Sequence, residues 1–164
     1  MINGIAIPHD FYWVLQSPAP LAGMAYPASS LSWPSLNTVG LSHVICLTER
    51  YFPYDPTPLA KLHAVGLQDL YGGRWPDHPE DEEHLIKEAT FIAVETLSKG
   101  EGIVVHCAGG TGRTGTVIGC ILRSLGFSSS KVLEYLDKLH TARGKRGWPE
   151  SPWQADVVER LQTS

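Results

Sequence analysis

The stretch of sequence that decides the fold is His106-Cys107-Ala108-Gly109-Gly110-Thr111-Gly112-Arg113-Thr114-Gly115. An apolar run, Gly102 to Val105, precedes it, and a second apolar run with helix-compatible residues, Thr116 to Leu125, follows it. The two apolar runs and the glycines between them therefore predict a strand, a glycine-rich turn and a helix. In that order of elements Cys107 opens the turn and Arg113 closes it.

This order of elements suits the binding of a phosphate. The first N–H groups of a helix lack intrahelical partners and lie at the positive end of the helix dipole. Arg113 adds a planar guanidinium fork that can hold two phosphoryl oxygens. Cysteines at helix N-termini ionise readily, so Cys107 is a candidate thiolate nucleophile aimed at phosphorus. Glycines let successive N–H groups turn toward one centre, and the predicted phosphate-binding backbone is Ala108, Gly109, Gly110, Thr111 and Gly112.

The pattern of His-Cys, five residues and Arg-Thr resembles the signature of the cysteine-dependent protein tyrosine phosphatase superfamily. The resemblance implies hydrolysis of a phosphate monoester through a phosphocysteine on Cys107. We expect no metal and no cofactor, because Arg113 and the loop N–H groups neutralise the phosphoryl charge. The alternative is a glycine-rich turn that holds a buried structural cysteine.

A second loop should carry an acid, because thiolate attack leaves an oxygen that needs a proton. Asp77 is the candidate, since it lies thirty positions before Cys107 and follows a run, Leu67 to Tyr71, that we expect to be a core strand. Trp75-Pro76-Asp77 also resembles the mobile acid loop of the superfamily. The alternative for Asp77 is an exposed turn residue.

Two neighbours of the nucleophile have supporting roles in this interpretation. We expect the ring of His106 to hydrogen-bond to nearby backbone and shape the loop. The hydroxyl of Thr114 is placed to donate to the sulfur of Cys107 and help it leave phosphorus in the second step. The alternative for Thr114 is a local hydrogen bond within the first helical turn.

Hydrolysis of the phosphocysteine needs a positioned water. Residues 148–154 are similar to the region of the superfamily that supplies a late glutamine for this purpose, and Gln154 is the candidate here. Glu150, or Asp77 acting as the base, remains an alternative.

Composition predicts one globular domain, residues 1–164, with 43% hydrophobic and 18% charged residues. A net charge of −4 argues against nucleic acid or an anionic membrane as the main partner. We expect no signal peptide and no membrane span, since no suitable apolar run is present. Three dispersed cysteines suggest no disulfide framework, and a working thiolate points to the reducing cytoplasm. The sequence does not indicate an oligomeric state.

Alternating strand and helix patterns predict an α/β fold with a mostly parallel central sheet and helices on both faces. Ligands bind at the carboxyl ends of the strands in such folds, where the turn after Val105 lies. The expected strands are 11–15, 21–25, 42–48, 67–71 and 102–105. The expected helices are a short one from Ser29 or Ser30 to 38, a turn or two over 59–64, and longer ones over about 80–100, 116–125, 128–140 and 153–161.

The chain resembles the small, atypical dual-specificity branch of the superfamily. Phe11 to Val14, Leu21 to Ala25 and Leu47-Thr48-Glu49 are similar to segments of its compact members. The resemblance implies a phosphorylated protein or peptide substrate, with phosphotyrosine and sometimes phosphoserine or phosphothreonine accepted. Alternatives are a phosphatase for a phosphoinositide, nucleotide or RNA 5′ end, and a pseudophosphatase that binds phosphoproteins without turnover. Ala108 and Thr111 stand where phosphoinositide-directed relatives often carry lysines, which disfavours a highly phosphorylated headgroup.

Several charged residues have open roles. Arg50, Arg74 and the run 143–146 could ring the mouth of the site or belong to a solvated surface. Glu49 could brace Arg113 or be a solvated loop acid. Cys46 and Cys120 lie in apolar segments, so we expect both in the core.

Overall fold

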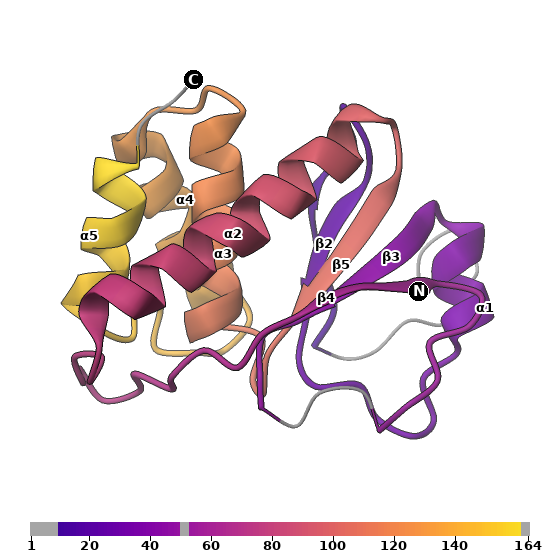
Figure 1. Cartoon of the computed structure of the whole chain (residues 1–164), viewed down its shortest axis with the longest axis horizontal. Helices are drawn as coiled ribbons and strands as arrows, with labels where there is room; N and C mark the ends of the chain where they lie inside the picture. Colours follow the sequence, from indigo (N-terminus) through magenta and orange to yellow (C-terminus); the bar gives the residue numbers. More distant parts are fainter. Residues whose placement is uncertain (1–9, 50–52, 162–164) are drawn as a thin grey trace.

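A mostly parallel sheet forms the centre of the computed structural model, which describes residues 10–49 and 53–161. Within these residues the strands are β1 (Tyr12–Leu15), β2 (Leu21–Met24), β3 (Leu41–Cys46), β4 (Ala60–Ala64) and β5 (Gly102–His106). Their order is β1-β2-β5-β3-β4 (Figure 1). The β2, β5, β3 and β4 strands run parallel, and β1 is an antiparallel edge. The predicted α/β fold class is confirmed.

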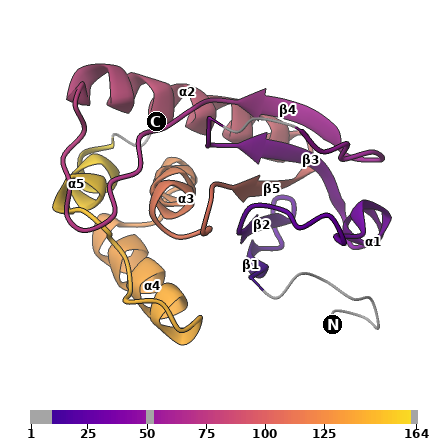
Figure 2. The same cartoon turned by 90° about the horizontal axis from the view of Figure 1, so that it is seen from below.

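Helices cover both faces of this sheet (Figure 2). In the described residues they are α1 (Trp33–Thr38), α2 (Pro79–Ser98), α3 (Gly112–Ser124), α4 (Ser129–Ala142) and α5 (Pro152–Arg160). The α1 helix packs on β3, whereas α2 and α3 pack on β5, and α4 and α5 pack on α3. Residues 107–111 therefore lie between the central strand β5 and the helix α3, which is enclosed by neighbouring helices.

The central strand β5 is buried on both faces. Ile103 and Val105 join the core cluster formed with α2 and α3, while Val104 between them joins a second cluster with Trp33 and Leu36 of α1. Each fully buried aliphatic side chain contributes about 1.5–3 kcal/mol. The carboxyl end of β5 is thus held firmly, and the residues that follow it start from a fixed position.

The predictions of helical turns over residues 59–64 and of a strand over residues 67–71 were wrong. Residues 60–64, expected as helical, form β4 and pair with β3 from His43–Ala60 to Cys46–Ala64. Helix propensities differ by less than about 1 kcal/mol per residue, so the open edge of β3 decides the conformation. Residues 67–71 form no strand, because only Leu67 and Leu70, three positions apart, are buried, and the chain then turns.

Helix starts follow local capping chemistry. The Ser128 hydroxyl caps α4, which was expected to begin at this residue. The α1 helix is capped by Ser32, whose hydroxyl accepts from the N–H of Ser35, whereas a start at Ser29 or Ser30 was expected. The first turn of α2 carries Glu80, Asp81 and Glu82, whose charges interact favourably with the helix dipole. The α3 helix begins at Gly112, four residues before the apolar run that indicated it.

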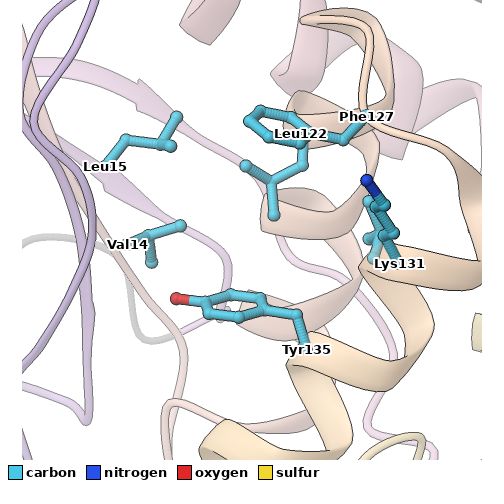
Figure 3. Close-up of a pocket in the computed structure, with 7 residues that line it drawn as sticks. Val14, Leu15, Leu122, Phe127, Lys131 and Tyr135 are labelled. Atoms are coloured by element: carbon cyan, nitrogen blue, oxygen red, sulfur yellow. The ribbon is translucent and has the colours of Figure 1, made fainter.

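An apolar cavity of about 240 Å³ lies beside the edge strand, at the far end of α3 from Gly112 (Figure 3). Val14 and Leu15 face Leu122 and Tyr135 across it. Lys131 and the hydroxyl of Tyr135 are polar groups at the lining of this otherwise apolar cavity. Among the described residues, no helix has both the length and the apolar character needed to cross a lipid bilayer.

Candidate active site

The segment from Cys107 to Thr111 connects the buried end of β5 to the start of α3. Cys107 is 2% exposed, at the floor of this turn. The N–H of Leu47, after β3, donates to the His106 carbonyl at 2.9 Å, and the N–H of Tyr26, after β2, donates to the Ala108 carbonyl at 2.9 Å. Neighbouring strand ends therefore hold the turn, here called the phosphate loop (residues 107–112).

The start of α3 leaves backbone N–H groups available to an anion. Thr111 is the N-cap residue, and its side chain makes no capping hydrogen bond to the first turn. Of the predicted phosphate-binding residues, 108–111 come directly before α3 and Gly112 begins it. In the described chain the N-terminus of this helix thus has no side-chain cap. Such a terminus attracts anions through its free donors and its dipole.

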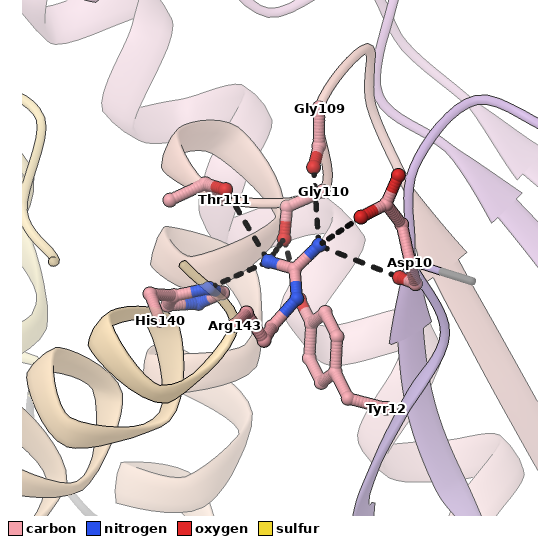
Figure 4. A network of polar contacts seen from close by, with 7 residues as sticks. All are labelled: Asp10, Tyr12, Gly109, Gly110, Thr111, His140 and Arg143. Atoms are coloured by element: carbon pink, nitrogen blue, oxygen red, sulfur yellow. Dashed lines mark hydrogen bonds and ion pairs between the residues drawn. The ribbon is translucent and has the colours of Figure 1, made fainter. Parts of the chain in front are cut away.

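Arg143 supports the outer side of the phosphate loop (Figure 4). Its Nη1 donates to the Gly110 carbonyl and to Thr111 Oγ1, both at 3.3 Å, and its Nη2 donates to the Gly109 carbonyl at 3.3 Å. The guanidinium also lies 4.4 Å from the centre of the Tyr12 ring. Only 10% of the Arg143 side chain is exposed. Arg143 was expected either at the mouth of the site or on a solvated surface, and its contacts with the backbone of the phosphate loop were not predicted.

Two buried rings complete the support. The Tyr12 hydroxyl donates to the Gly110 carbonyl at 2.6 Å, and burial raises the pKa of Tyr12 well above its ordinary value, so this donor keeps its proton. Arg143 Nη1 lies 2.8 Å from His140 Nδ1, which must accept because arginine only donates. Burial and the Arg143 charge lower the pKa of His140 to about 3. His140 is therefore a neutral ring whose lone pair helps to hold Arg143.

Neighbouring atoms approach the phosphate loop so closely at two positions that only glycine fits there. Gly110 has φ +74°, and a Cβ there would lie 2.6 Å from the backbone carbonyl carbon of Met24. A Cβ on Gly112 would overlap the Glu150 carboxylate. A side chain at either position would displace the loop, which explains their place in the glycine-rich motif.

His106 is fully buried and hydrogen-bonds as expected. Its Nδ1 lies 3.1 Å from the Cys107 carbonyl and, in the neutral ring, donates to it. The opposite nitrogen, Nε2, accepts from the hydroxyl of Tyr54. Burial raises the pKa of Tyr54 far above its ordinary value, so the hydroxyl stays a donor. Tyr54 lies in the segment between β3 and β4, and its contact with His106 was not predicted.

Arg113 and Asp77 share one cavity. It has a volume of about 400 Å³ and is also lined by Glu49, Gln68 and Glu82, among others. Arg113 Nη1 donates to the Leu67 carbonyl at 3.3 Å, so its guanidinium is partly fixed by the segment that follows β4. Asp77 is exposed, on the loop that follows this segment. The structure thus brings together two residues that stand in separate sequence motifs.

The expected hydrogen bond from Thr114 to the sulfur of Cys107 is not present. Thr114 is fully buried, and its Oγ1 has no hydrogen-bond partner among the residues that the structure describes. A buried hydroxyl without a partner costs about 1–3 kcal/mol. This orphaned group lies one residue after Arg113, in the first turn of α3.

Gln154 is buried in a capping box at the start of α5. Its Oε1 accepts from the N–H groups of Glu150 and Ser151 at 2.9 and 3.2 Å, so that oxygen is already engaged. Its Nε2 points toward Gly112, 3.1 Å from where a Cβ would stand. Burial, and to a smaller extent Asp69, raise the pKa of Glu150, which also lies against Gly112.

The remaining charged candidates separate into two groups. Lys145 and Arg146 line a second cavity of about 520 Å³ together with Thr111 and Glu150, so they lie near the phosphate loop. Glu49 and Arg74 are exposed, and Arg50 lies outside the described residues. Cys46 and Cys120 are buried as expected, and burial raises the pKa of Cys120 to about 12. No group of three or more metal-ligating side chains comes together in the described chain.

Known proteins similar to this chain are phosphatases by name. Putative tyrosine phosphatase 067L of Invertebrate iridescent virus 3 is 38% identical over 81 residues, which cover 44% of this chain and 34% of the viral protein. Putative tyrosine-protein phosphatase OCA1 of Kluyveromyces lactis is 31% identical over 126 residues, covering 72% of this chain and 58% of the yeast protein. The chain thus spans less than two thirds of the length of either relative.

A solved structure shares the fold. The crystal structure of the core catalytic domain of the PP-IP phosphatase SIW14 from S. cerevisiae, in complex with citrate, has a TM-score of 0.67 and 19% identity. The match covers 96% of this chain and 88% of that one. At the level of a family, residues 8–148 match PTP-SAK, the DSP-PTPase phosphatase domain of Swiss Army Knife proteins. The chain therefore belongs to this DSP-PTPase phosphatase family, in the dual-specificity branch of the protein tyrosine phosphatases.

Proposed function

We propose that this chain hydrolyses phosphate monoesters on proteins or peptides through a phosphocysteine. The observation that carries the proposal is the meeting of two independent motifs. Cys107 lies at the floor of the phosphate loop, and Arg113, which closes that loop, lines one cavity with Asp77. A module that only binds phosphoproteins has no need for an acid beside the phosphate-binding arginine.

In the first half of the proposed reaction, the Cys107 thiolate attacks phosphorus and the ester P–O bond breaks. Arg113 and the N–H groups of residues 108–112 hold the phosphoryl oxygens as their charge develops. Asp77 donates its proton to the departing oxygen, which leaves as an alcohol or phenol. The phosphoryl group is then bonded to sulfur.

In the second half, water attacks the phosphocysteine, the S–P bond breaks and inorganic phosphate is released. Asp77, now a carboxylate, takes a proton from the water. Gln154 is our candidate to place this water, through the Nε2 that points toward Gly112, and Glu150 is the alternative at the same glycine. A hydrogen bond from Thr114 to the departing thiolate needs a movement of the Thr114 hydroxyl, which has no competing partner in the described chain.

The charges around the cavity favour a single phosphoryl group. Glu49, Asp69 and Glu82 line it together with Asp77, and Arg113 is its basic side chain. Residues 108–112 include no lysine. A headgroup with several phosphates would meet carboxylates there, whereas a phosphotyrosine carries one phosphate on a neutral ring. The proposal treats residues 1–164 as one catalytic domain that works in the reducing cytoplasm, where a thiolate survives.

A panel of substrates tests the proposal. Phosphotyrosine, phosphoserine and phosphothreonine peptides are compared by kcat/KM with phosphoinositides, nucleotides and an RNA 5′-triphosphate, in the presence of a reductant. We expect phosphotyrosine peptides to give the highest values and the Cys107→Ser variant to be inactive on all substrates. A higher kcat/KM for any non-protein ester would replace the protein substrate by that class. Binding of phosphopeptides without turnover by the unaltered chain would instead identify a pseudophosphatase.

A further inference from the structure

The segment that follows β4 is fixed to the sheet. The N–H of Val65 donates to the Cys46 carbonyl at 2.9 Å, and the N–H of Leu67 donates to the Leu47 carbonyl at 3.2 Å. These bonds continue the pairing of β4 with β3 past the end of the strand. Gln68 follows immediately, so its backbone position is set by the sheet.

Gln68 connects three parts of the site. Its side-chain Oε1 accepts from the backbone N–H of Asp77 at 2.8 Å. Its own N–H donates to Glu82 Oε2, in the first turn of α2, at 2.8 Å. The carbonyl of Leu67, the residue before it, accepts from Arg113 Nη1. One dipeptide therefore contacts the candidate acid, the helix that follows it and the phosphate-binding arginine.

The loop that carries Asp77 is exposed up to Trp75, which is 57% exposed, and Pro76 before Asp77 is buried. After Asp77, the His78 carbonyl accepts from the N–H of Glu82 at the start of α2. The backbone bonds from Gly73 to the Glu150 carbonyl and from Arg74 to the Leu70 carbonyl lie three or more residues before Asp77. The bond to Gln68 is made at Asp77 itself, between residues nine positions apart.

We propose that Gln68 is a positioning residue for general acid catalysis, because it holds the Asp77 backbone so that the carboxyl group can reach the leaving oxygen. This inference rests on the proposed role of Asp77. Proton transfer requires the acid within about 2.6–3.2 Å of its partner, and a displacement of about 1 Å can reduce a rate about 100-fold. Glu82 assists by fixing the backbone of Gln68.

This role predicts a dependence on the leaving group. Phenol is a poorer leaving group than p-nitrophenol and needs the proton more. Loss of a correctly placed acid therefore slows phenyl phosphate more than p-nitrophenyl phosphate. A general loss of structure, or of phosphate binding, slows both substrates by the same factor.

The experiment compares Gln68→Met, which keeps the side-chain volume and removes the accepting oxygen, with Gln68→Glu, which keeps an oxygen at that place. Asp77→Asn and the double variant Asp77→Asn, Gln68→Met complete a cycle. Gln16→Met, an exposed glutamine after β1, is the matched control. For each protein kcat/KM is measured with both substrates, KM and inhibition by inorganic phosphate report on binding, and urea unfolding reports on folding.

We expect Gln68→Met to reduce kcat/KM about tenfold or more for phenyl phosphate and clearly less for p-nitrophenyl phosphate. Phosphate inhibition should not change. Gln68→Glu should recover most of the loss, Gln16→Met should match the unaltered chain, and Gln68→Met should add less than about twofold to Asp77→Asn. An equal loss on both substrates, or full additivity with Asp77→Asn, would overturn the role of Gln68 alone. If Asp77→Asn shows no leaving-group dependence, the acid itself is misassigned and the proposed mechanism fails with it.

Discussion

The two loops that meet at the site are held in opposite ways. The phosphate loop is enclosed: strand ends, Tyr12 and Arg143 bind its carbonyl groups, and Cys107 is 2% exposed. The loop that carries Asp77 lies on the surface and is held at that residue by Gln68. The difference matches the tasks proposed for them, since oriented dipoles stabilise charge only when they are already in place. A proton donor must instead reach a group that changes with each substrate.

The largest expected effect separates chemistry from binding within the enclosed loop. Cys107→Ser replaces the sulfur and leaves the backbone donors and Arg113 unchanged. We expect turnover of p-nitrophenyl phosphate to fall by about 1,000-fold or more. Affinity for a phosphotyrosine peptide, measured by fluorescence anisotropy, should remain within about threefold, as the loop is preorganised by its surroundings. Undiminished hydrolysis by this variant would refute the nucleophile.

Removal of Arg143 tests whether the support around the phosphate loop matters. Arg143→Met keeps an unbranched apolar stem, removes the guanidinium and leaves the carbonyl groups of Gly109 and Gly110 without this donor. We expect kcat/KM to fall about 100-fold and the free energy of unfolding to fall by about 2–4 kcal/mol. Arg146→Met, three residues away and exposed, is the control and should change stability by less than about 0.5 kcal/mol. Equal effects of the two substitutions on kcat/KM and on the free energy of unfolding would contradict the proposal that Arg143 supports the phosphate loop.

The contrast between Arg143 and Arg113 shows what a sequence can reveal. Arg113 was found because it has a fixed spacing from Cys107, and Asp77 because it stands in a second local motif. Arg143 is thirty residues beyond Arg113, at the end of α4, and only the packing of α4 against α3 brings it to the loop. Its neighbours Lys145 and Arg146 are exposed, so nothing in the run 143–146 marks one arginine as buried.

The errors in the predicted fold also arise from contacts between segments that are distant in sequence. Residues 60–64 carry weak local preferences, and the pairing of β4 with the open edge of β3, distant in sequence, decides their conformation. The central strand β5 is buried on both faces, so its apolar run alone was sufficient to predict a strand there. Gln154 shows a further effect, since the resemblance that suggested its role in catalysis gave no sign that Ser151 would engage its Oε1 in a capping box.

A more moderate effect is expected on the second chemical step, the hydrolysis of the phosphocysteine, from a change at the start of α5 near the phosphate loop. Gln154→Ala removes the capping acceptor and the Nε2 that points toward Gly112. We expect a loss of stability of about 1 kcal/mol from the cap and slower hydrolysis of the phosphocysteine. A burst of p-nitrophenol followed by a slower steady rate, in stopped-flow measurements, would reveal the accumulated intermediate. If Glu150→Gln gives the burst and Gln154→Ala does not, the water is placed by Glu150.

An effect on stability alone, with no change in the chemical steps, is expected from the pH dependence of the residues that support the enclosed loop. His140 is buried, and its pKa is lowered to about 3 by burial and by Arg143. Histidine in an unfolded chain has a pKa near 6.5. Between these values the unfolded chain binds a proton that the folded chain does not, so stability is present above about pH 6.5 and is lost as the pH falls toward 3.

His140→Gln keeps an acceptor for Arg143 and removes the titration. Urea unfolding at pH 7 and pH 5 gives the free energy for both proteins, and the other titrating groups cancel in the comparison. We expect the unaltered chain to lose about 1–2 kcal/mol more than the variant between these two pH values, because each pH unit in the window contributes at most about 1.4 kcal/mol. Equal losses would mean that His140 accepts a proton in the folded chain. The hydrogen bond from Arg143 to its Nδ1 would then be absent, and the phosphate loop would be held less firmly than its contacts indicate.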